Sequence, residues 1–197
     1  MENMANLCVF CSSSSKVSKK YKEETAHLGT LIGKKKHCLI YGGGNVGLMG
    51  ILARNVHDNG GKIIGIIPKA IADYGIVYKD ADELIVTTSM SERKQKMTKK
   101  ADAFIILPGG FGTLEELFEV LTLKQLQYES KAIVIVNINH FYDKMFDFFE
   151  KIFEEKFAKS QFKELYHVAE NVDGAIKYIT NYQTQEFPEK WYPEKYR

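Results

Sequence analysis

Residues 104–116 have the sequence FIILPGGFGTLEE, which passes from an apolar run through a glycine-rich turn into a stretch with helical spacing. Pro108 ends the apolar run, and three glycines within the next four residues free the backbone of the turn. An apolar run without alternating polar residues is typical of a strand buried on both faces, as in a parallel sheet. The segment therefore predicts a strand–turn–helix unit of an α/β protein.

The same alternation recurs along the whole chain. We expect strands at 7–11, 38–41, 63–67, 84–86, 104–107 and 132–136, and helices at about 19–33, 47–59, 90–100, 113–128, 141–156 and 172–182. Right-handed crossovers wind such a β-α-β-α order into an open sheet with helices on both faces. The predicted fold is a Rossmann-like three-layer sandwich with a mostly parallel sheet.

Composition limits the classes of protein to which the chain can belong. Its 197 residues, 45% of them hydrophobic, suit a single domain over residues 1–197, in which the aromatic segment 183–197 forms a packed extension or a partner contact. With 27 basic and 25 acidic residues, there is no overall field to attract nucleic acid or a membrane surface. No leader pattern and no apolar run near the ~18 residues of a membrane span occur, so we expect a cytoplasmic protein.

Three cysteines are too few for a disulfide scaffold and suit a reducing compartment. Cys8 and Cys11 match the C-x-x-C pattern of redox and metal sites. Residues three apart on a strand point to opposite faces, so the predicted strand at 7–11 would separate the two thiols. We therefore expect neither a redox centre nor a metal site here.

Ligands of this fold bind outside the carboxyl ends of the strands, where the chain has two glycine turns. In the first turn, 42–50, Gly42, Gly44 and Gly47 fit G-x-G-x-x-G, and Gly43 and Gly44 are candidates for ligand contact. Helix amides following such a turn favour an anion. The next strand lacks the acidic residue that a dinucleotide site requires, which disfavours NAD and FAD. The alternative is that this turn is a tight strand-to-helix connection that binds no ligand.

The second turn, 107–113, leads into a helix that carries Glu116. Thr113 could cap this helix and offer a hydroxyl to an anion. Glu116 lies three residues further on, which is the spacing of a capping box. The spacing leaves open whether Glu116 is a capping residue or a catalytic carboxylate.

Two cations begin the predicted helix at 90–100. A helix N-terminus disfavours positive charge, so Arg93 and Lys94 indicate a bound anion. Alternatively, Arg93 pairs on the surface with an acidic neighbour (Glu92, Asp82 or Glu83), and its position taken alone favours this second interpretation.

Three motifs in this order, YGGGNVGLMG at 41–50, ERKxxM at 92–97 and PGGFGTLEE at 108–116, resemble the Lonely guy family. Its members are cytokinin riboside 5'-monophosphate phosphoribohydrolases, often labelled lysine decarboxylases, and the resemblance extends over about residues 8–142. It implies hydrolysis of the bond between base and ribose in a nucleoside 5'-monophosphate. It also implies that the enzyme needs no metal or organic cofactor and is a homodimer in which a partner helix helps to close the site.

The resemblance implies that Arg93 and Glu116 form the catalytic pair. The positions expected to contact the substrate are Lys94, Gly110, Phe111, Gly112, Thr113 and Thr122, with Gly109 completing the phosphate turn. Glycoside hydrolysis passes through an oxocarbenium-like state, so Glu116 could stabilise positive charge and activate water. Arg93 could hold the phosphate or ribose, or orient Glu116, and both roles stay open.

The sequence departs from the family pattern at Ser91, where many members have His, at Ser12, where many have Gly, and at Ala70, where plant members have an acidic residue. The usual Trp is also missing from 122–127. These differences leave the base open between adenine and an N6-substituted adenine.

The sequence leaves two other functions to be tested. One is a non-catalytic nucleotide carrier or sensor. The other is lysine decarboxylation, for which no lysine has the context of a pyridoxal phosphate site.

Overall fold

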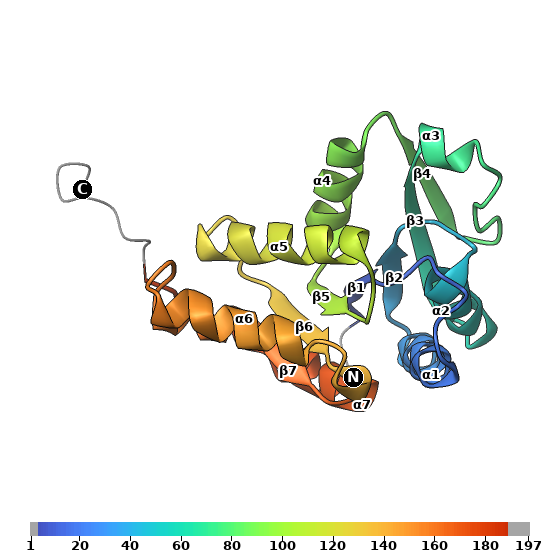
Figure 1. Cartoon of the computed structure of the whole chain (residues 1–197). Helices are drawn as coiled ribbons and strands as arrows, with labels where there is room; N and C mark the ends of the chain where they lie inside the picture. The colour runs from blue at the N-terminus through green and yellow to red at the C-terminus, as the bar shows by residue number, and fades with distance from the viewer. Residues whose placement is uncertain (1–3, 189–197) are drawn as a thin grey trace.

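The computed structural model describes residues 4–188 and contains one seven-stranded sheet (Figure 1). The strands are β1 (Asn6–Phe10), β2 (Cys38–Tyr41), β3 (Lys62–Pro68), β4 (Glu83–Thr87), β5 (Ala103–Ile106), β6 (Ala132–Val136) and β7 (His167–Ala169). They pair in the order β4-β3-β2-β1-β5-β6-β7, and every pair is parallel. The strand order reverses between β1 and β5, which makes this point the expected place for a ligand.

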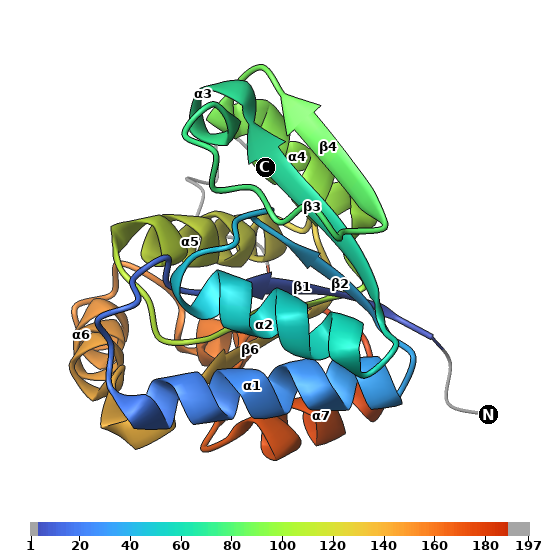
Figure 2. The same cartoon turned by 90° about the vertical axis from the view of Figure 1, so that its right-hand side faces the viewer.

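Helices cover both faces of the sheet (Figure 2). One layer contains α1 (Lys19–Lys34), α2 (Gly47–Asp58) and α7 (Val172–Thr180), and the other contains α4 (Met90–Lys100), α5 (Phe111–Gln125) and α6 (Asp143–Glu154). Three short helical segments complete the fold: α3 (Lys69–Ala72), η1 (Ile138–His140) and η2 (Ser160–Leu165). The predicted Rossmann-like sandwich is confirmed.

The side chains of β1 show how the sheet separates two cores. Leu7 and Val9 pack with α1, α2 and α7, whereas Cys8 and Phe10 pack with α4, α5 and α6. Cys11 lies in the first core and Cys8 in the second, so the C-x-x-C thiols point to opposite faces as predicted. Burial raises the pKa of both thiols, which makes them poor nucleophiles and poor metal ligands.

The start of α5 differs from the sequence prediction. The helix begins at Phe111 with Gly110 as its N-cap, and the amide of Leu114 donates to the Gly110 carbonyl at 3.0 Å. Thr113 therefore lies inside the first turn, and its predicted capping role is wrong. Because the helix starts two residues earlier, Glu116 lies beyond the first turn, and the capping-box alternative for Glu116 is wrong too.

β2, β6 and α4 have the predicted bounds, the other boundaries move by at most three residues, and β7, α3, η1 and η2 were not predicted. α5 ends at Gln125 rather than near residue 128, because Gln127 has a φ of 63° that a helix cannot contain. No helix in residues 4–188 is both long and apolar enough to cross a membrane.

The first part of the aromatic extension packs against the domain. Phe187 is half-buried, and its carbonyl accepts a hydrogen bond from Gln127 Nε2 at 3.0 Å. The other aromatic residues expected to make this contact, Trp191, Tyr192 and Tyr196, lie outside the described residues.

Candidate active site

A hollow of about 500 Å³ opens at the carboxyl ends of β1, β2, β3 and β5, next to the reversal of strand order. Its lining combines a polar loop after β1, both glycine turns and an apolar wall. The lining residues are Val9, Phe10, Cys11, Ser12, Ser13, Ser14, Gly42, Gly44, Met49, Ile67, Pro68, Ile71, Ile76, Met90, Arg93, Gly110, Phe111, Gly112, Thr113 and Glu116.

Arg93 and Glu116 meet in this hollow, although 23 positions separate them in the chain. Arg93 Nη1 donates to Glu116 Oε1 at 2.6 Å, and each residue is only 8% exposed. Arg93 Nε donates to the Ile66 carbonyl at the end of β3, at 3.0 Å, which fixes the plane of the guanidinium. The surface pairing of Arg93 with Glu92, Asp82 or Glu83 is therefore wrong, because the helix turns this side chain inward.

The pKa of Glu116 is raised, because burial disfavours its charged form and the positive charge of Arg93 offsets only part of that effect. A carboxylate with few water neighbours interacts strongly with any positive charge that develops beside it. Its raised pKa also makes Glu116 a stronger base than an exposed glutamate. The site can therefore both stabilise a cation and accept a proton from water.

A capping box at the start of α4 sets the direction of Arg93. Ser89 Oγ accepts from the Glu92 amide at 3.1 Å, and Glu92 Oε2 accepts from the amide and the hydroxyl of Thr88 at 2.8 and 2.7 Å. The Thr88 amide, with help from Lys96, lowers the pKa of Glu92 to about 2. Residue 92 is thus used for capping, and residue 93 points into the hollow.

The first turn of α5 provides a site for an anion. The amides of Phe111, Gly112 and Thr113 have no carbonyl partner within the helix, and these residues line the hollow. Gly109 lies behind them, and a Cβ there would be 2.1 Å from Thr113 Oγ1, so only glycine allows this packing. The turn presents unpaired amides at the positive end of a 15-residue helix.

The glycine turn between β2 and α2 lies on the other side of the guanidinium. Gly42 and Gly44 line the hollow, and a Cβ on Gly42 would lie 2.5 Å from Arg93 Nη2. Gly43 has a φ of 72° and does not line the hollow, and its carbonyl accepts from the Tyr78 amide at 3.0 Å. The turn thus gives room to Arg93 and ties the segment after α3 to the site.

Two expected substrate contacts, Lys94 and Thr122, lie outside the hollow. Lys94 Nζ pairs with Glu115 and, at 2.6 Å, with Glu119. Thr122 lies beside these residues, and both line a separate shallow depression on the outer side of α4 and α5. Within one chain, therefore, neither side chain reaches the Arg93–Glu116 pair.

Sequence reasoning did not assign the apolar wall formed by Met49, Ile67, Ile71, Ile76 and Met90. These residues come from four separate segments, and each of them resembles ordinary core in the sequence. The polar loop at 12–14 was a detectable feature, because it directly follows the first strand, at the edge of the sheet where ligands bind.

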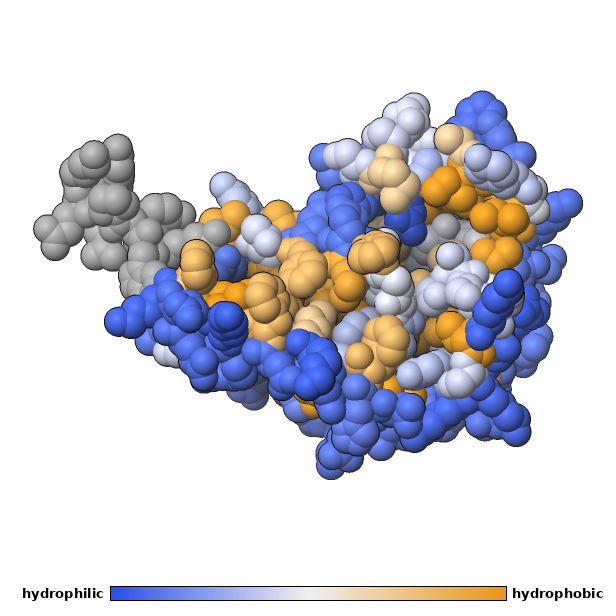
Figure 3. All heavy atoms as spheres, in the orientation of Figure 1, coloured by the Kyte–Doolittle hydropathy of each residue, from blue (hydrophilic) through white to orange (hydrophobic). Residues whose placement is uncertain are grey.

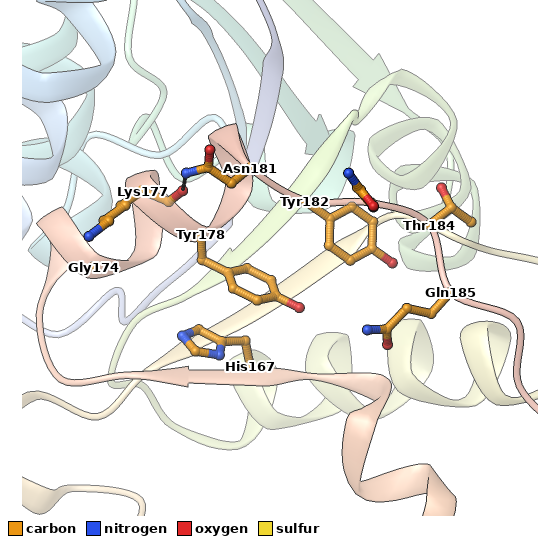
Figure 4. Close-up of a pocket in the computed structure, with 9 residues that line it drawn as sticks. His167, Gly174, Lys177, Tyr178, Asn181, Tyr182, Thr184 and Gln185 are labelled. Carbon is orange, nitrogen blue, oxygen red and sulfur yellow. Dashed lines mark hydrogen bonds between the residues drawn. The ribbon is translucent and has the colours of Figure 1, made fainter.

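A second cavity, of about 610 Å³, lies between α7, β7 and the segment after α7 (Figure 4). The rings of His167 and Tyr178 stack there with their centres 4.0 Å apart, and Tyr182 lies beside them. None of its lining residues is acidic. This cavity therefore has no group that could take the role of Glu116.

Comparisons with known proteins find relatives over most of the chain. A family model described as "Possible lysine decarboxylase" matches residues 49–179. Two cytokinin riboside 5'-monophosphate phosphoribohydrolases of Arabidopsis thaliana are similar to this chain. One is 39% identical over 176 residues, which cover 89% of this chain and 83% of the relative. The other is 37% identical over 179 residues, or 91% and 82% of the two chains.

Solved structures share the fold at lower identity. The molybdenum cofactor binding protein of Rippkaea orientalis superposes with a TM-score of 0.69 at 20% identity, over 91% of this chain and 97% of that one. The molybdenum cofactor carrier protein of Chlamydomonas reinhardtii gives 0.68 at 22% identity, over 89% and 95%. At these identities the likeness extends to the fold alone.

Proposed function

Because this chain belongs to the Lonely guy family, we propose that it hydrolyses the N-glycosidic bond of a purine nucleoside 5'-monophosphate to give free base and ribose 5-phosphate. The observation that carries this proposal is the buried Arg93–Glu116 pair, which lies in the same hollow as the unpaired amides of the α5 turn. A charged pair with so little solvent contact is costly to fold and is typical of a functional site.

The reaction follows from the positions of these groups. The amides of Phe111, Gly112 and Thr113 would bind the 5'-phosphate and hold the ribose over Glu116. As the bond from C1' to the base nitrogen lengthens, the Glu116 carboxylate would stabilise the positive charge on the ribose. Glu116 would then accept a proton from the water that attacks C1' and later return it to solvent, while the departing base would take the bonding electrons and a proton from solvent.

Arg93 acts in this mechanism mainly by orienting Glu116. Its Nε is occupied by the Ile66 carbonyl and its Nη1 by the carboxylate, so little of the guanidinium is left for a bidentate phosphate contact. Nη2 faces Gly42, whose missing side chain leaves the guanidinium its space.

The apolar wall bears on the choice of base. Ile71 and Ile76 come from the segment around α3, and Met49 and Met90 flank it in the hollow. Burial of apolar area stabilises binding by roughly 25 cal/mol per Å², so such a wall favours an adenine with an apolar N6 substituent over adenine itself. A panel of AMP and N6-substituted analogues would test this preference. Equal kcat/KM values for AMP and the analogues would contradict it.

We also propose that the chain is a cytoplasmic homodimer. Apolar side chains gather over α5 and α6 (Figure 3), where Phe118 is 43% and Phe157 is 83% exposed. Large exposed apolar patches mark interfaces. Lys94 and Thr122 lie on the same side of α5, so a second copy seated there would bring these two positions to a shared interface. The free thiols at positions 8, 11 and 38 suit a reducing cytoplasm.

The central experiment measures base release. Wild-type protein incubated with AMP or an N6-substituted AMP should liberate base and ribose 5-phosphate, resolved by chromatography. Glu116→Gln and Arg93→Ala should each reduce kcat by about 100-fold or more, as expected for loss of a catalytic base or its orienting partner. Full activity in either variant would refute the assigned role.

The two alternative functions have distinct outcomes in this assay. Stable nucleotide binding without base release over hours would favour a carrier or sensor. Lysine decarboxylation would need a lysine to hold pyridoxal phosphate, and none of the residues described as lining the hollow is a lysine. Release of CO₂ from lysine after addition of pyridoxal phosphate would support it nevertheless.

A further inference from the structure

Tyr142 lies directly behind the α5 turn and contacts its backbone. It follows η1, it is only 2% exposed, and it does not line the hollow. Its phenol Oη donates to the Leu107 carbonyl at 2.8 Å, where β5 ends. One hydroxyl thus fixes the carbonyl that precedes Pro108.

This contact pairs a polar group at the base of the turn. Pro108 has no amide hydrogen, the amide of Leu107 donates to the Phe10 carbonyl at 2.9 Å, and the Tyr142 hydroxyl donates to the Leu107 carbonyl. The Gly110 carbonyl accepts the first helical bond of α5. The turn is thus held by paired groups at both ends, and the amides of the first turn of α5, which have no carbonyl partner within the helix, belong to residues that line the hollow.

Tyr142 is itself held firmly from the neighbouring strand. Its amide donates to Asn137 Oδ1 at 2.8 Å, and Asn137 Nδ2 donates to Asp143 Oδ1 at 2.7 Å. The Asn137 amide donates to the Ala169 carbonyl at 2.8 Å, which ties the loop after β6 to β7. Phe146 and Phe141 pack against the Tyr142 ring, with centres 6.4 and 4.8 Å away. The hydroxyl therefore has a fixed position relative to the sheet.

From this geometry we propose that Tyr142 is a positioning residue for phosphate recognition, which holds the backbone at Leu107 so that the amides of the α5 turn face the ligand. This inference rests on the proposed function, since it assigns the phosphate to that turn. Tyr142 touches no substrate and acts only through the turn. A buried hydroxyl that donates to a backbone carbonyl is the one feature that distinguishes it from a phenylalanine at this place.

The test is Tyr142→Phe, which removes only the hydroxyl. Tyr182→Phe is the control, because Tyr182 Oη also donates to a backbone carbonyl, that of Ser130 at 2.7 Å, and accepts from Lys124 Nζ at 2.9 Å, both away from the turn. Calorimetric titration with ribose 5-phosphate should give about tenfold weaker binding for Tyr142→Phe, the scale of one lost buried hydrogen bond. Tyr182→Phe should bind like wild type. With AMP, KM should rise by a similar factor while kcat changes less than about threefold.

Three outcomes would overturn the proposal. They are unchanged ribose 5-phosphate binding in Tyr142→Phe, equal weakening in both variants, and a fall in kcat with unchanged KM. Failure of the proposed function looks different. If wild type released no base from AMP but bound ribose 5-phosphate tenfold more tightly than Tyr142→Phe, the hydrolase assignment would fall and the role of Tyr142 would stand. Wild type that binds no ribose 5-phosphate would refute the phosphate turn and Tyr142 together.

Discussion

At the scale of single residues, the site depends on one carboxylate and the groups that hold it. Glu116 is buried against Arg93, and the guanidinium is fixed by a strand-end carbonyl and by the space above Gly42. Each of these contacts joins residues that lie far apart in the sequence. A substitution at any one of these partners should therefore shift the carboxylate of Glu116.

The pH dependence of activity should reflect the raised pKa of Glu116. The carboxylate must be ionised to act, so kcat/KM should fall as the pH drops through its pKa. Since burial raises that pKa, the acid limb of the profile should lie above the ordinary glutamate value of about 4.3. A pH–rate profile of base release from AMP measures this limb. A midpoint at or below the ordinary value would contradict the assignment of Glu116 as the base.

Gly42→Ala should disturb the guanidinium. The new methyl group would lie 2.5 Å from Arg93 Nη2 and 3.1 Å from Met49 Sδ, and Arg93 cannot yield without weakening its contacts to Ile66 and Glu116. We expect kcat/KM to fall by about tenfold or more, as for a misplaced catalytic group. Steady-state kinetics measure this effect.

Gly174→Ala is the control for that substitution, because its Cβ would meet neighbours only at 3.4 Å and beyond. It should keep wild-type kinetics. Equal activity in Gly42→Ala and wild type would show that the guanidinium has more room than the structure gives it.

At the scale of elements, two helix starts build the site, and each begins in a different way. α4 is capped by the side chain of Ser89, whereas α5 has Gly110 as its N-cap and no side-chain cap. The capped helix presents a side chain, Arg93, and the uncapped one presents bare amides. Both helices begin at the carboxyl edge of the sheet, where a right-handed crossover must enter its helix.

Removal of the α4 cap should loosen the position of Arg93. Ser89→Ala loses the bond to the Glu92 amide, which costs about 1 kcal/mol for a typical N-cap, and a domain of this size should lose roughly 2–4 °C in Tm. We expect kcat/KM to fall severalfold as well, because Arg93 lies in the same turn. Ser91→Ala, an exposed change on that turn, is the control. A similar loss in both variants would argue against a specific role of the cap.

At the scale of the whole molecule, Lys124 joins α5 to the segment that follows α7. It is 2% exposed, and its Nζ donates to the Lys131 carbonyl and to Tyr182 Oη, both at 2.9 Å. The ammonium also lies over the rings of Tyr182 and Phe187. Burial lowers the pKa of Lys124 from 10.5 to about 8.

This lowered pKa predicts a pH-dependent stability. Between about pH 8 and 10.5 the unfolded chain binds a proton at Lys124 that the folded chain has released, so this lysine makes the free energy of unfolding rise with pH in that window. Across this pH window, the free energy of unfolding of wild type should rise by up to about 3 kcal/mol relative to that of Lys124→Met. Urea unfolding at pH 7.5, 9 and 10 measures the difference.

Lys131→Met is the control, because Lys131 keeps a carboxylate partner, Glu129, at 2.9 Å. It should keep the rise of stability with pH, because Lys124 is intact in this variant. If wild type and Lys124→Met changed in parallel with pH, Lys124 would not be the group that titrates.

The sequence by itself determined the layers of this molecule and predicted the edge of the sheet at which a ligand would bind. Continuous apolar runs predicted strands buried on both faces, and the glycine turns after them marked the ligand edge. These are local signals, because burial and turn conformation depend on residues close together in the chain. The motifs at 92–97 and 108–116 also identified the family.

Only the tertiary structure decided where the side chains of Glu116 and Arg93 lie. The local sequence left Glu116 open between a capping box and a catalytic role and favoured a surface ion pair for Arg93, since spacing along a helix does not determine which distant helix lies opposite. Packing α4 and α5 on one face of the sheet buried the two side chains against each other. Likewise, nothing near residue 142 predicted that its hydroxyl would reach the end of β5, because that contact exists only where β5 and the loop after β6 lie side by side.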